Sequence, residues 1–341
     1  MAVKEEFDLI AMVQGLNWLM RQLYSQIAKT EEFPELLKEP KSFVQIVEDK
    51  KYKNLRITEA FLKYLADQGI ISLEDGKYQW NSTERRRVKG KLVVESEAIG
   101  IQKVQEKAMP LFGILRTYAE GLPSILRGSI AEREAELIIW DALYTTELYK
   151  YLRREALRRA NLPKNSVILD FGCRSGWSTI DILEELEPSK IYAVDPSPVM
   201  IELAYENLLA LDKATKVEFI PYDFDFENRI ATEQKCDAAF IGLLFNRFSG
   251  EKITDMLLAL RSILKGGSRV CGLQPIKDSD ALHPAEILLY ADKEFKGYPE
   301  YDVFKTAFLR AGFTKPVIEN SMFFHTTYIA EKPVEKPKKK K

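Results

Sequence analysis

Histidine and cysteine are both scarce in this chain of 341 residues. It contains two histidines and three cysteines, Cys173, Cys236 and Cys271. Because the cysteines are odd in number and form no Cys-x-x-Cys pair, the sequence indicates neither a disulfide framework nor a zinc ribbon. We therefore expect no metal site, and a reducing compartment, the cytoplasm, fits this use of cysteine.

Long apolar runs and an excess of one charge are also missing. The richest apolar stretch, 238–245, is far shorter than the roughly 18 residues that span a bilayer. The first residues lack the basic and apolar regions of a signal peptide. Lys and Arg number 50 against 51 Asp and Glu, so no basic bias indicates nucleic acid. With 46% hydrophobic and 30% charged residues, the composition is that of a globular protein, and the length suggests about two domains.

The segment 1–90 favours a small helical domain that ends in a hairpin. Apolar residues three or four apart over 7–29 predict one amphipathic helix. Its apolar stripe needs a partner, either within the domain or in a second subunit, so a homodimer is plausible. Shorter helices follow, and Asp75-Gly76 between two apolar segments is a strong hairpin signal. Three helices followed by a hairpin are the order of a winged helix.

A winged helix suggests DNA, but the charge of its third helix argues against that partner. The outward residues of this helix are Arg56, Glu59, Lys63 and Asp67, whose charges sum to zero. A helix that enters the major groove normally carries net positive charge. The basic run 85–91 is interpreted as a solvated linker, with phosphate contact as the alternative. Nucleic acid is therefore not the expected partner.

The rest of the chain predicts a helical connector over 91–160 and alternating strands and helices over 161–331. The early strands are nearly continuous apolar runs, as in a parallel sheet that helices cover on both faces. The short turn before the last strand predicts that this strand is antiparallel. The predicted fold class is α/β, a seven-stranded Rossmann-like domain preceded by an α-helical winged-helix domain. The Lys-rich segment 332–341 is expected to be a disordered tail. The seven strands are expected at 167–171, 191–194, 217–220, 238–241, 269–273, 317–320 and 323–330.

Acidic residues lie at or directly after the ends of the first three of these strands. Asp170 precedes a glycine-rich turn, and glycines between a strand and a helix let a ligand approach free N–H groups. Asp195 ends the second strand, where a carboxylate can accept hydrogen bonds from two ribose hydroxyls. Asp223 and Phe224 follow the third, as an acid and an aromatic that suit an adenine. Because the carboxyl ends of parallel strands meet at one edge of the sheet, these residues predict an adenosine-containing ligand.

The same segments resemble a known family. Val-Ile-Leu-Asp-Phe-Gly-Cys-Arg-Ser-Gly at 167–176 looks like motif I of class I S-adenosylmethionine-dependent methyltransferases. The segments 192–204, 217–224, 264–270 and 308–313 are similar to later motifs and turns of that family. The whole layout resembles small-molecule O-methyltransferases that have an N-terminal winged-helix dimerisation domain. The resemblance implies methyl transfer from S-adenosylmethionine to a small-molecule acceptor, at oxygen.

The resemblance also implies roles for single residues. It assigns Asp195 to the ribose, Asp223 with Phe224 to the adenine, and Asp170 to the loop or the methionyl amine. Glycines in the turn let the cofactor approach the backbone. The full set of implied cofactor-binding residues is Asp170, Gly172, Arg174, Gly176, Asp195, Pro196, Asp223 and Phe224.

Two positions depart from the family pattern. Arg174 stands where motif I usually has glycine, and it could pair with the cofactor carboxylate, block the cofactor or turn to solvent. Asn246 stands where O-methyltransferases with a general base have a histidine, and an amide cannot take a proton from a hydroxyl. His283 is the substitute candidate for the base, although an acceptor that is already ionised needs none. Asn246 and Arg247 are the candidate substrate residues.

These departures keep a second hypothesis open. A non-catalytic protein can retain the methyltransferase fold and act as a winged-helix regulator or as a partner subunit. The missing histidine, Arg174 and the basic segments 85–91 and 332–341 favour it, whereas the neutral third helix does not.

Overall fold

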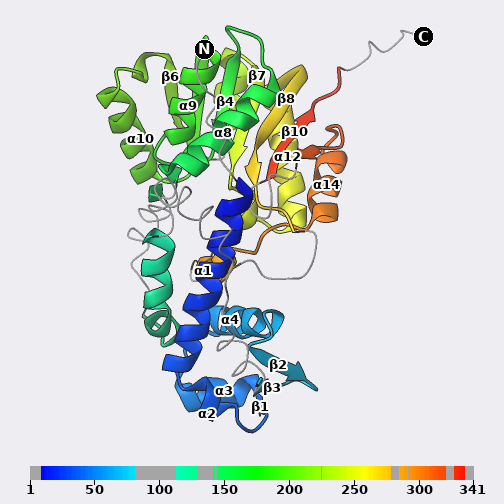
Figure 1. Ribbon diagram of the computed structural model, residues 1–341. Coiled ribbons are helices and arrows are strands. Elements are labelled where there is room, and N and C mark those ends of the chain that lie inside the picture. The colour runs from blue at the N-terminus through cyan, green and yellow to red at the C-terminus, as the bar shows by residue number, and fades with distance from the viewer. Residues whose placement is uncertain are drawn as a thin grey trace, which may run out of the picture. The chain divides into compact units, whose positions relative to one another are not determined.

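The computed structural model describes the chain as two compact units (Figure 1). Unit 1 comprises the described parts of 1–143 and 279–297, and unit 2 those of 144–278 and 298–341. The described residues are 9–81, 113–129, 141–142, 144–223, 225–277, 284–290, 292, 294–319 and 326–334.

Unit 1 contains the predicted N-terminal helices and hairpin. Its first helix, α1 (Leu9–Thr30), lies close to the predicted bounds. The strand β1 was not predicted, because two residues carry no pattern. It joins the hairpin in an antiparallel sheet of order β1-β3-β2. After α1 the elements are α2 (Phe33–Leu36), β1 (Lys41–Ser42), α3 (Phe43–Lys50), α4 (Leu55–Asp67), β2 (Ile71–Glu74) and β3 (Lys77–Trp80).

Local side-chain chemistry sets the ends of these helices. Ser42 caps α3, since its hydroxyl accepts from the Gln45 amide and the Gln45 side chain accepts from the Ser42 amide. The helix α4 begins at Leu55, because the Asn54 side chain accepts from the Ile57 amide and caps it. The hairpin turns at Asp75 and Gly76, both at positive φ, as its sequence predicts.

One outward residue of α4 is not free. The short helix α13 (Pro284–Leu289) belongs to unit 1 and packs on α4 and α1. The Arg56 guanidinium donates to the Phe295 carbonyl and lies 5.5 Å from the centroid of the Tyr290 ring. A segment that follows the fifth predicted strand therefore occupies part of the α4 surface that would face a nucleic acid.

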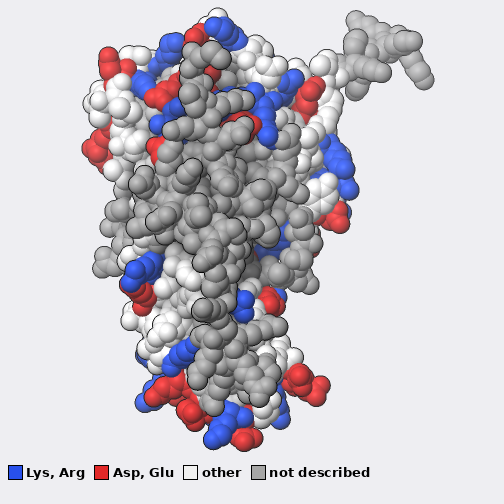
Figure 2. All heavy atoms as spheres, viewed as in Figure 1, with Lys and Arg blue, Asp and Glu red and all other residues white. Residues whose placement is uncertain are grey.

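Charge on the surface is mixed in sign. On the face that Figure 2 shows, basic and acidic side chains of the described residues are interspersed. The basic run 85–91 and most of the Lys-rich tail, 335–341, lie outside the described residues. Within the described part of the chain, no helix is both long and apolar enough to cross a membrane.

Unit 2 is built on the predicted seven-stranded sheet. Its strand order is β6-β5-β4-β7-β8-β10-β9, and β10 runs antiparallel to both of its neighbours. The predicted α/β fold with an antiparallel last strand is confirmed. The strands are β4 (Val167–Phe171), β5 (Lys190–Asp195), β6 (Val217–Pro221), β7 (Cys236–Gly242), β8 (Leu264–Gln274), β9 (Val317–Glu319) and β10 (Thr326–Glu331).

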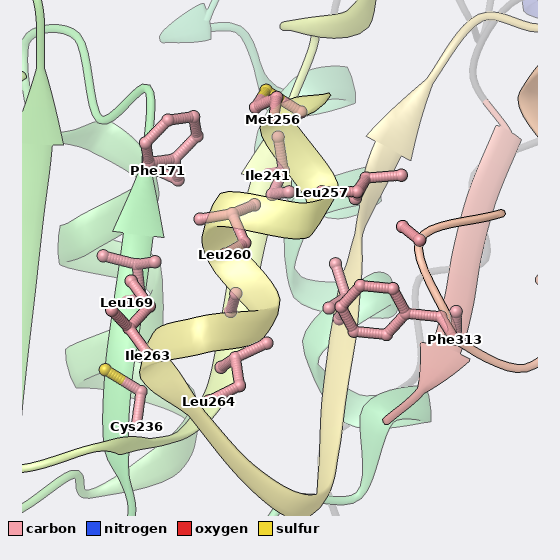
Figure 3. Close-up of a cluster of buried hydrophobic side chains, with 14 of the residues drawn as sticks. Leu169, Phe171, Cys236, Ile241, Met256, Leu257, Leu260, Ile263, Leu264 and Phe313 are labelled. Atoms are coloured by element: carbon pink, nitrogen blue, oxygen red, sulfur yellow. The ribbon is translucent and has the colours of Figure 1, made fainter. Parts of the chain in front are cut away.

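Helices cover both faces of the sheet, and the two faces differ. On one face Leu169 and Phe171 of β4 and Ile241 of β7 meet Leu257 and other residues of α12 in an apolar core (Figure 3). Because side chains alternate along a strand, Asp170 points to the opposite face, toward α9. The remaining elements of unit 2 are α8 (Glu147–Ala160), α9 (Trp177–Leu186), α10 (Pro198–Ala210), η1 (Ala214–Lys216), α11 (Phe226–Glu233), η2 (Phe245–Arg247), α12 (Gly250–Ile263) and α14 (Tyr301–Arg310).

The compact units do not coincide with the expected segments, since 279–297 also belongs to unit 1. The expected connector 91–160 is divided, because α8 packs on α9, β8 and β10 and so belongs to unit 2. Residues 145–146 interrupt the helical structure of the expected connector, and residues 130–140 lie outside the described part. Lys332, the first residue of the expected tail, is buried, and its Nζ donates to the Arg261 and Leu264 carbonyls at the end of α12.

Candidate functional site

Asp170 carries a buried oxygen without a hydrogen-bond partner among the described residues. Its Oδ2 accepts from the hydroxyls of Ser178 (2.7 Å) and Thr179 (2.6 Å) at the start of α9. Its Oδ1 is buried and has no hydrogen-bond partner among the described residues. Burial raises the pKa of Asp170 to about 6, although the two hydroxyls and the charge of Arg153 oppose the rise. Such an oxygen is suited to accept from a cationic group of a ligand.

The glycines of the turn after β4 serve the packing of the protein itself. Gly172 and Gly176 have φ of 81° and 87°, where residues other than glycine are strained. A Cβ on Gly176 would lie 2.8 Å from Leu208 Cδ1 and 3.1 Å from Ala204 Cβ, so this glycine lets α10 pack closely. A Cβ on Gly172 would lie 3.3 Å from Leu244 Cδ2, which brings the loop after β7 against this turn.

The Asp195 carboxylate is held in place by hydrogen bonds that occupy only half of its acceptor sites. Asp195 ends β5, and its two oxygens accept from the backbone amides of Arg174 (3.0 Å) and Ser197 (2.9 Å). An ionised carboxylate has about four lone-pair sites, so each oxygen keeps one for a further donor. Two neighbouring ribose hydroxyls fit that requirement. Burial raises the pKa of Asp195, while the two amides and the charges of Arg174 and Arg247 oppose the rise. Pro196 follows and is exposed.

Arg174 does not turn fully to solvent. It is half-buried, in the left-handed backbone conformation (φ 50°), and its Cζ lies 5.3 Å from the centroid of the Tyr144 ring. That distance is within the range of a cation–π contact. The family pattern has glycine at this position, which explains a backbone conformation that costs an arginine about 1–2 kcal/mol.

Tyr144 is a site residue that sequence analysis missed. It is buried, its ring stacks on Tyr149 at 5.8 Å, and Arg153 lies 5.2 Å from its centroid. A Cβ on Gly242 would lie 2.9 Å from the Tyr144 hydroxyl, which places this hydroxyl at the carboxyl end of β7. No sequence pattern singled out Tyr144, and the break in the helix at 145–146 has no glycine or proline to signal it.

The loop after β7 contributes Asn246 and Arg247. Both lie in η2. The backbone amide of Phe245, the first residue of this turn, donates to the side-chain oxygen of Gln274 at the end of β8. Asn246 Oδ1 is buried and finds no hydrogen-bond partner in the described part of the chain. An amide oxygen in this state can accept from a hydroxyl or N–H but cannot remove its proton.

Of the two residues expected to contact the adenine, the structure describes Asp223 but not Phe224. Asp223 is exposed, and its Oδ1 already accepts from Arg229 Nη2 (2.8 Å) and the Asp225 amide (3.0 Å). Its neighbour Tyr222, which the sequence did not single out, is 43% exposed and packs edge-on against Phe171. Phe224 and His283 lie outside the described residues.

Comparisons with known proteins identify what this part of the chain is similar to. Residues 168–267 match the family model of a methyltransferase domain. Over 86 residues the chain is 30% identical to human MTRF1L release factor glutamine methyltransferase. That match covers 24% of this chain, and the chain spans about a quarter (25%) of the relative's length.

Solved structures extend the likeness in fold to nearly the whole chain. The CurJ carbon methyltransferase is 16% identical, with a TM-score of 0.66 and coverage of 96% of this chain and 100% of that one. An O-methyltransferase family 2 protein from Planctomyces limnophilus, solved with apigenin, is 14% identical, with a TM-score of 0.51 and coverage of 95% of both chains. At such low identities these likenesses establish the fold. Within that fold, residues 168–267 are the part of the chain that matches the model of a methyltransferase domain.

Proposed function

We propose that this chain transfers a methyl group from S-adenosylmethionine to an oxygen of a small-molecule acceptor. The observation that carries the proposal is the carboxylate of Asp195. It lies buried at the carboxyl end of β5, is oriented by two backbone amides and keeps one acceptor site on each oxygen. A domain family match over residues 168–267 supports the same conclusion.

The residues present fit the cofactor. Asp195 would bind the two ribose hydroxyls, and the open Oδ1 of Asp170 would accept from the methionyl ammonium. The adenine would lie beyond β6, near Pro196, Tyr222, Asp223 and Phe224. When bound, the cofactor would supply a methyl group on a positively charged sulfur: the acceptor atom would bond to the methyl carbon while the carbon–sulfur bond breaks, and the sulfur would leave as a neutral thioether.

The acceptor we propose is an enol or phenol that ionises without a protein base. Asn246 replaces the expected histidine, and its open Oδ1 would orient the acceptor through a hydrogen bond. Methyl transfer to an anion needs mainly in-line positioning and exclusion of water. An ionised enol can also react at carbon, and CurJ is described as a carbon methyltransferase. Analysis of the methylated product of an enol acceptor shows whether the methyl group was transferred to oxygen or to carbon.

His283 stays the candidate base if an acceptor with a neutral hydroxyl proves to react.

An Asp195→Ala substitution is expected to weaken S-adenosylmethionine binding about 100-fold, because hydrogen bonds to a carboxylate contribute about 1.5–3 kcal/mol each. Calorimetric titration with S-adenosylmethionine and S-adenosylhomocysteine measures it. Asp237→Ala is the matched control. Asp237 also accepts from a backbone amide, that of Val167, but at the opposite end of β4. Equal affinity of the Asp195→Ala variant and the wild type would refute the proposed cofactor site.

Binding of the cofactor is also expected to depend on pH near 6. The ammonium needs the ionised form of Asp170, whose pKa burial raises to about 6. Affinity should therefore be constant above pH 7 and fall as the pH drops through 6, by about tenfold per unit below it. Titrations from pH 5 to pH 8 measure the slope. Asp170→Asn should remove this dependence, which separates Asp170 from Asp195, and a flat wild-type profile would contradict the role of Asp170.

We further propose that unit 1 is a winged helix with a structural rather than a DNA-reading role. Its elements have the winged-helix order, and the exposed Arg56 of α4 already donates a hydrogen bond to the Phe295 carbonyl of the same unit. Such a unit can dimerise through α1. The non-catalytic regulator remains the second hypothesis. Salt-dependent binding to DNA would favour it, and methyl transfer to any acceptor would exclude its non-catalytic form.

A further inference from the structure

Arg174 carries a positive charge that lacks a counter-ion in the described structure. No carboxylate of the described residues lies within 4.0 Å of its guanidinium, whereas Arg153, which contacts the same Tyr144 ring, is paired with Asp181 at 2.7 Å. Arg174 is half-buried, and its charge acts on both Asp195 and Tyr149. A half-buried guanidinium that lies on an aromatic ring and lacks an anion is a site for an anionic ligand group.

The position of Arg174 decides which anion it can meet. Its backbone amide donates to Asp195, the proposed ribose ligand, and its side chain extends to Tyr144, whose hydroxyl lies by Gly242 at the end of β7. In the sheet β4 lies between β5 and β7, so Arg174 bridges from the ribose side to the side where Asp170 would take the methionyl ammonium. The cofactor has one anionic group, the methionyl carboxylate, and it is attached to the same carbon as that ammonium.

We propose that Arg174 binds the methionyl carboxylate of the cofactor, with its guanidinium preorganised by the Tyr144 ring. This inference rests on the proposed function and adds to it a specificity-determining residue. Arg174 and Asp170 then bind the two charges of the amino-acid group from opposite sides. The arginine selects ligands that carry a carboxylate, and it takes a place that motif I usually gives to glycine.

The competing possibility is that Arg174 excludes the cofactor. A guanidinium fixed in the site would repel the sulfonium and fill its space. The two possibilities predict opposite effects of the same substitution. Arg174→Gly weakens cofactor binding if the side chain holds the carboxylate, and strengthens binding if the side chain blocks the site.

Arg174→Gly is also a substitution that the fold should accept. The backbone at this position has φ of 50°, which glycine adopts without strain. The variant should therefore be at least as stable as the wild type, and a thermal unfolding curve checks this. A loss of binding in a stable variant then reports the missing side chain.

The test compares S-adenosylmethionine with decarboxylated S-adenosylmethionine, which differs only in lacking the carboxylate. Calorimetry of the wild type should show about 10- to 100-fold tighter binding of the carboxylate form. Arg174→Gly should bind both ligands with the affinity that the wild type has for the decarboxylated form. Arg174→Lys, which keeps the charge, should recover part of the discrimination.

Other results overturn the inference and identify what failed. Equal wild-type affinities for the two ligands, or tighter binding by Arg174→Gly, refute the role of Arg174 but leave the cofactor site intact. Loss of discrimination in Arg247→Ala instead assigns the carboxylate to Arg247, the second guanidinium that acts on Asp195. Binding of neither ligand by the wild type refutes the proposed function together with this inference.

Discussion

A Gly272→Ala substitution is expected to prevent stable folding of unit 2. Gly272 lies in β8 opposite Ile241 of β7, and a Cβ there would be 1.9 Å from the Ile241 carbonyl oxygen. The backbones of β7 and β8 cannot move apart far enough to remove this clash without breaking the hydrogen bonds that pair the two strands. The loss should exceed the about 4 kcal/mol that marks exceptional substitutions. Urea unfolding followed by circular dichroism measures it.

Gly266→Ala is the matched control for this substitution. Gly266 lies in the same strand, but the nearest atom to its Cβ would be Val334 Cα at 3.4 Å, which is ordinary contact. Its unfolding free energy should change by no more than about 0.5 kcal/mol. A Gly272→Ala protein as stable as this control would contradict the close approach of β7 and β8.

The close approach at Gly272 also shapes the site. It leaves room for the Tyr328 hydroxyl of β10, which donates to the Ile241 carbonyl at 2.9 Å. Ile241 immediately precedes Gly242, where the absence of a side chain makes room for the Tyr144 hydroxyl. Two glycines in neighbouring strands thus let two tyrosines pack at the edge of the sheet where Asp170 lies.

The strands and their acidic ends could be predicted from the sequence, because both depend on local pattern. Buried parallel strands are short apolar runs, and the first residues after them must lie at one edge of the sheet. Asp170 and Asp195 were found in this way, and both occupy the expected strand ends. The structure adds what they bind within the protein, such as the Arg174 amide on Asp195.

Other parts of the site depend on contacts between segments far apart in sequence. Tyr144 joins the site because a helix breaks at 145–146 and because Gly242, almost one hundred residues later, leaves space for its hydroxyl. Gly176 was expected to let a ligand approach the backbone, and the structure adds that a Cβ at this position would also meet Leu208 of α10. The hydrogen bond from Arg56 to the Phe295 carbonyl likewise joins residues far apart in sequence, and no local pattern predicts it.

An Asp181→Asn substitution is expected to lower the unfolding free energy of unit 2 by about 3–5 kcal/mol, because it leaves a buried charge without its partner. Asp181 of α9 binds Arg153 (2.7 Å) through one oxygen and Arg154 (2.8 Å) through the other, and both the Asp181 and the Arg153 side chains are 2% exposed. Arg154 keeps Glu184 and Glu185, but the structure gives Arg153 no other carboxylate among the described residues.

Replacing the arginine instead of the aspartate should lower the unfolding free energy by less, and this difference tests the buried ion pair. Arg153→Met removes the buried cation, while Asp181 keeps its ion pair with Arg154. The Tyr144 carbonyl loses its donor, which should cost about 1–3 kcal/mol. The double variant should be more stable than the sum of the single losses predicts, since the second change removes the charge that the first left unpaired. Urea unfolding of all four proteins gives the coupling, and strict additivity would show that the pair does not act as a unit.

Because Arg153 also contacts the Tyr144 ring, Arg153→Met should weaken S-adenosylmethionine binding as well. Arg158→Met is the control for binding. Arg158 lies in the same helix and pairs with Glu185 at the surface, so its loss should leave the affinity unchanged.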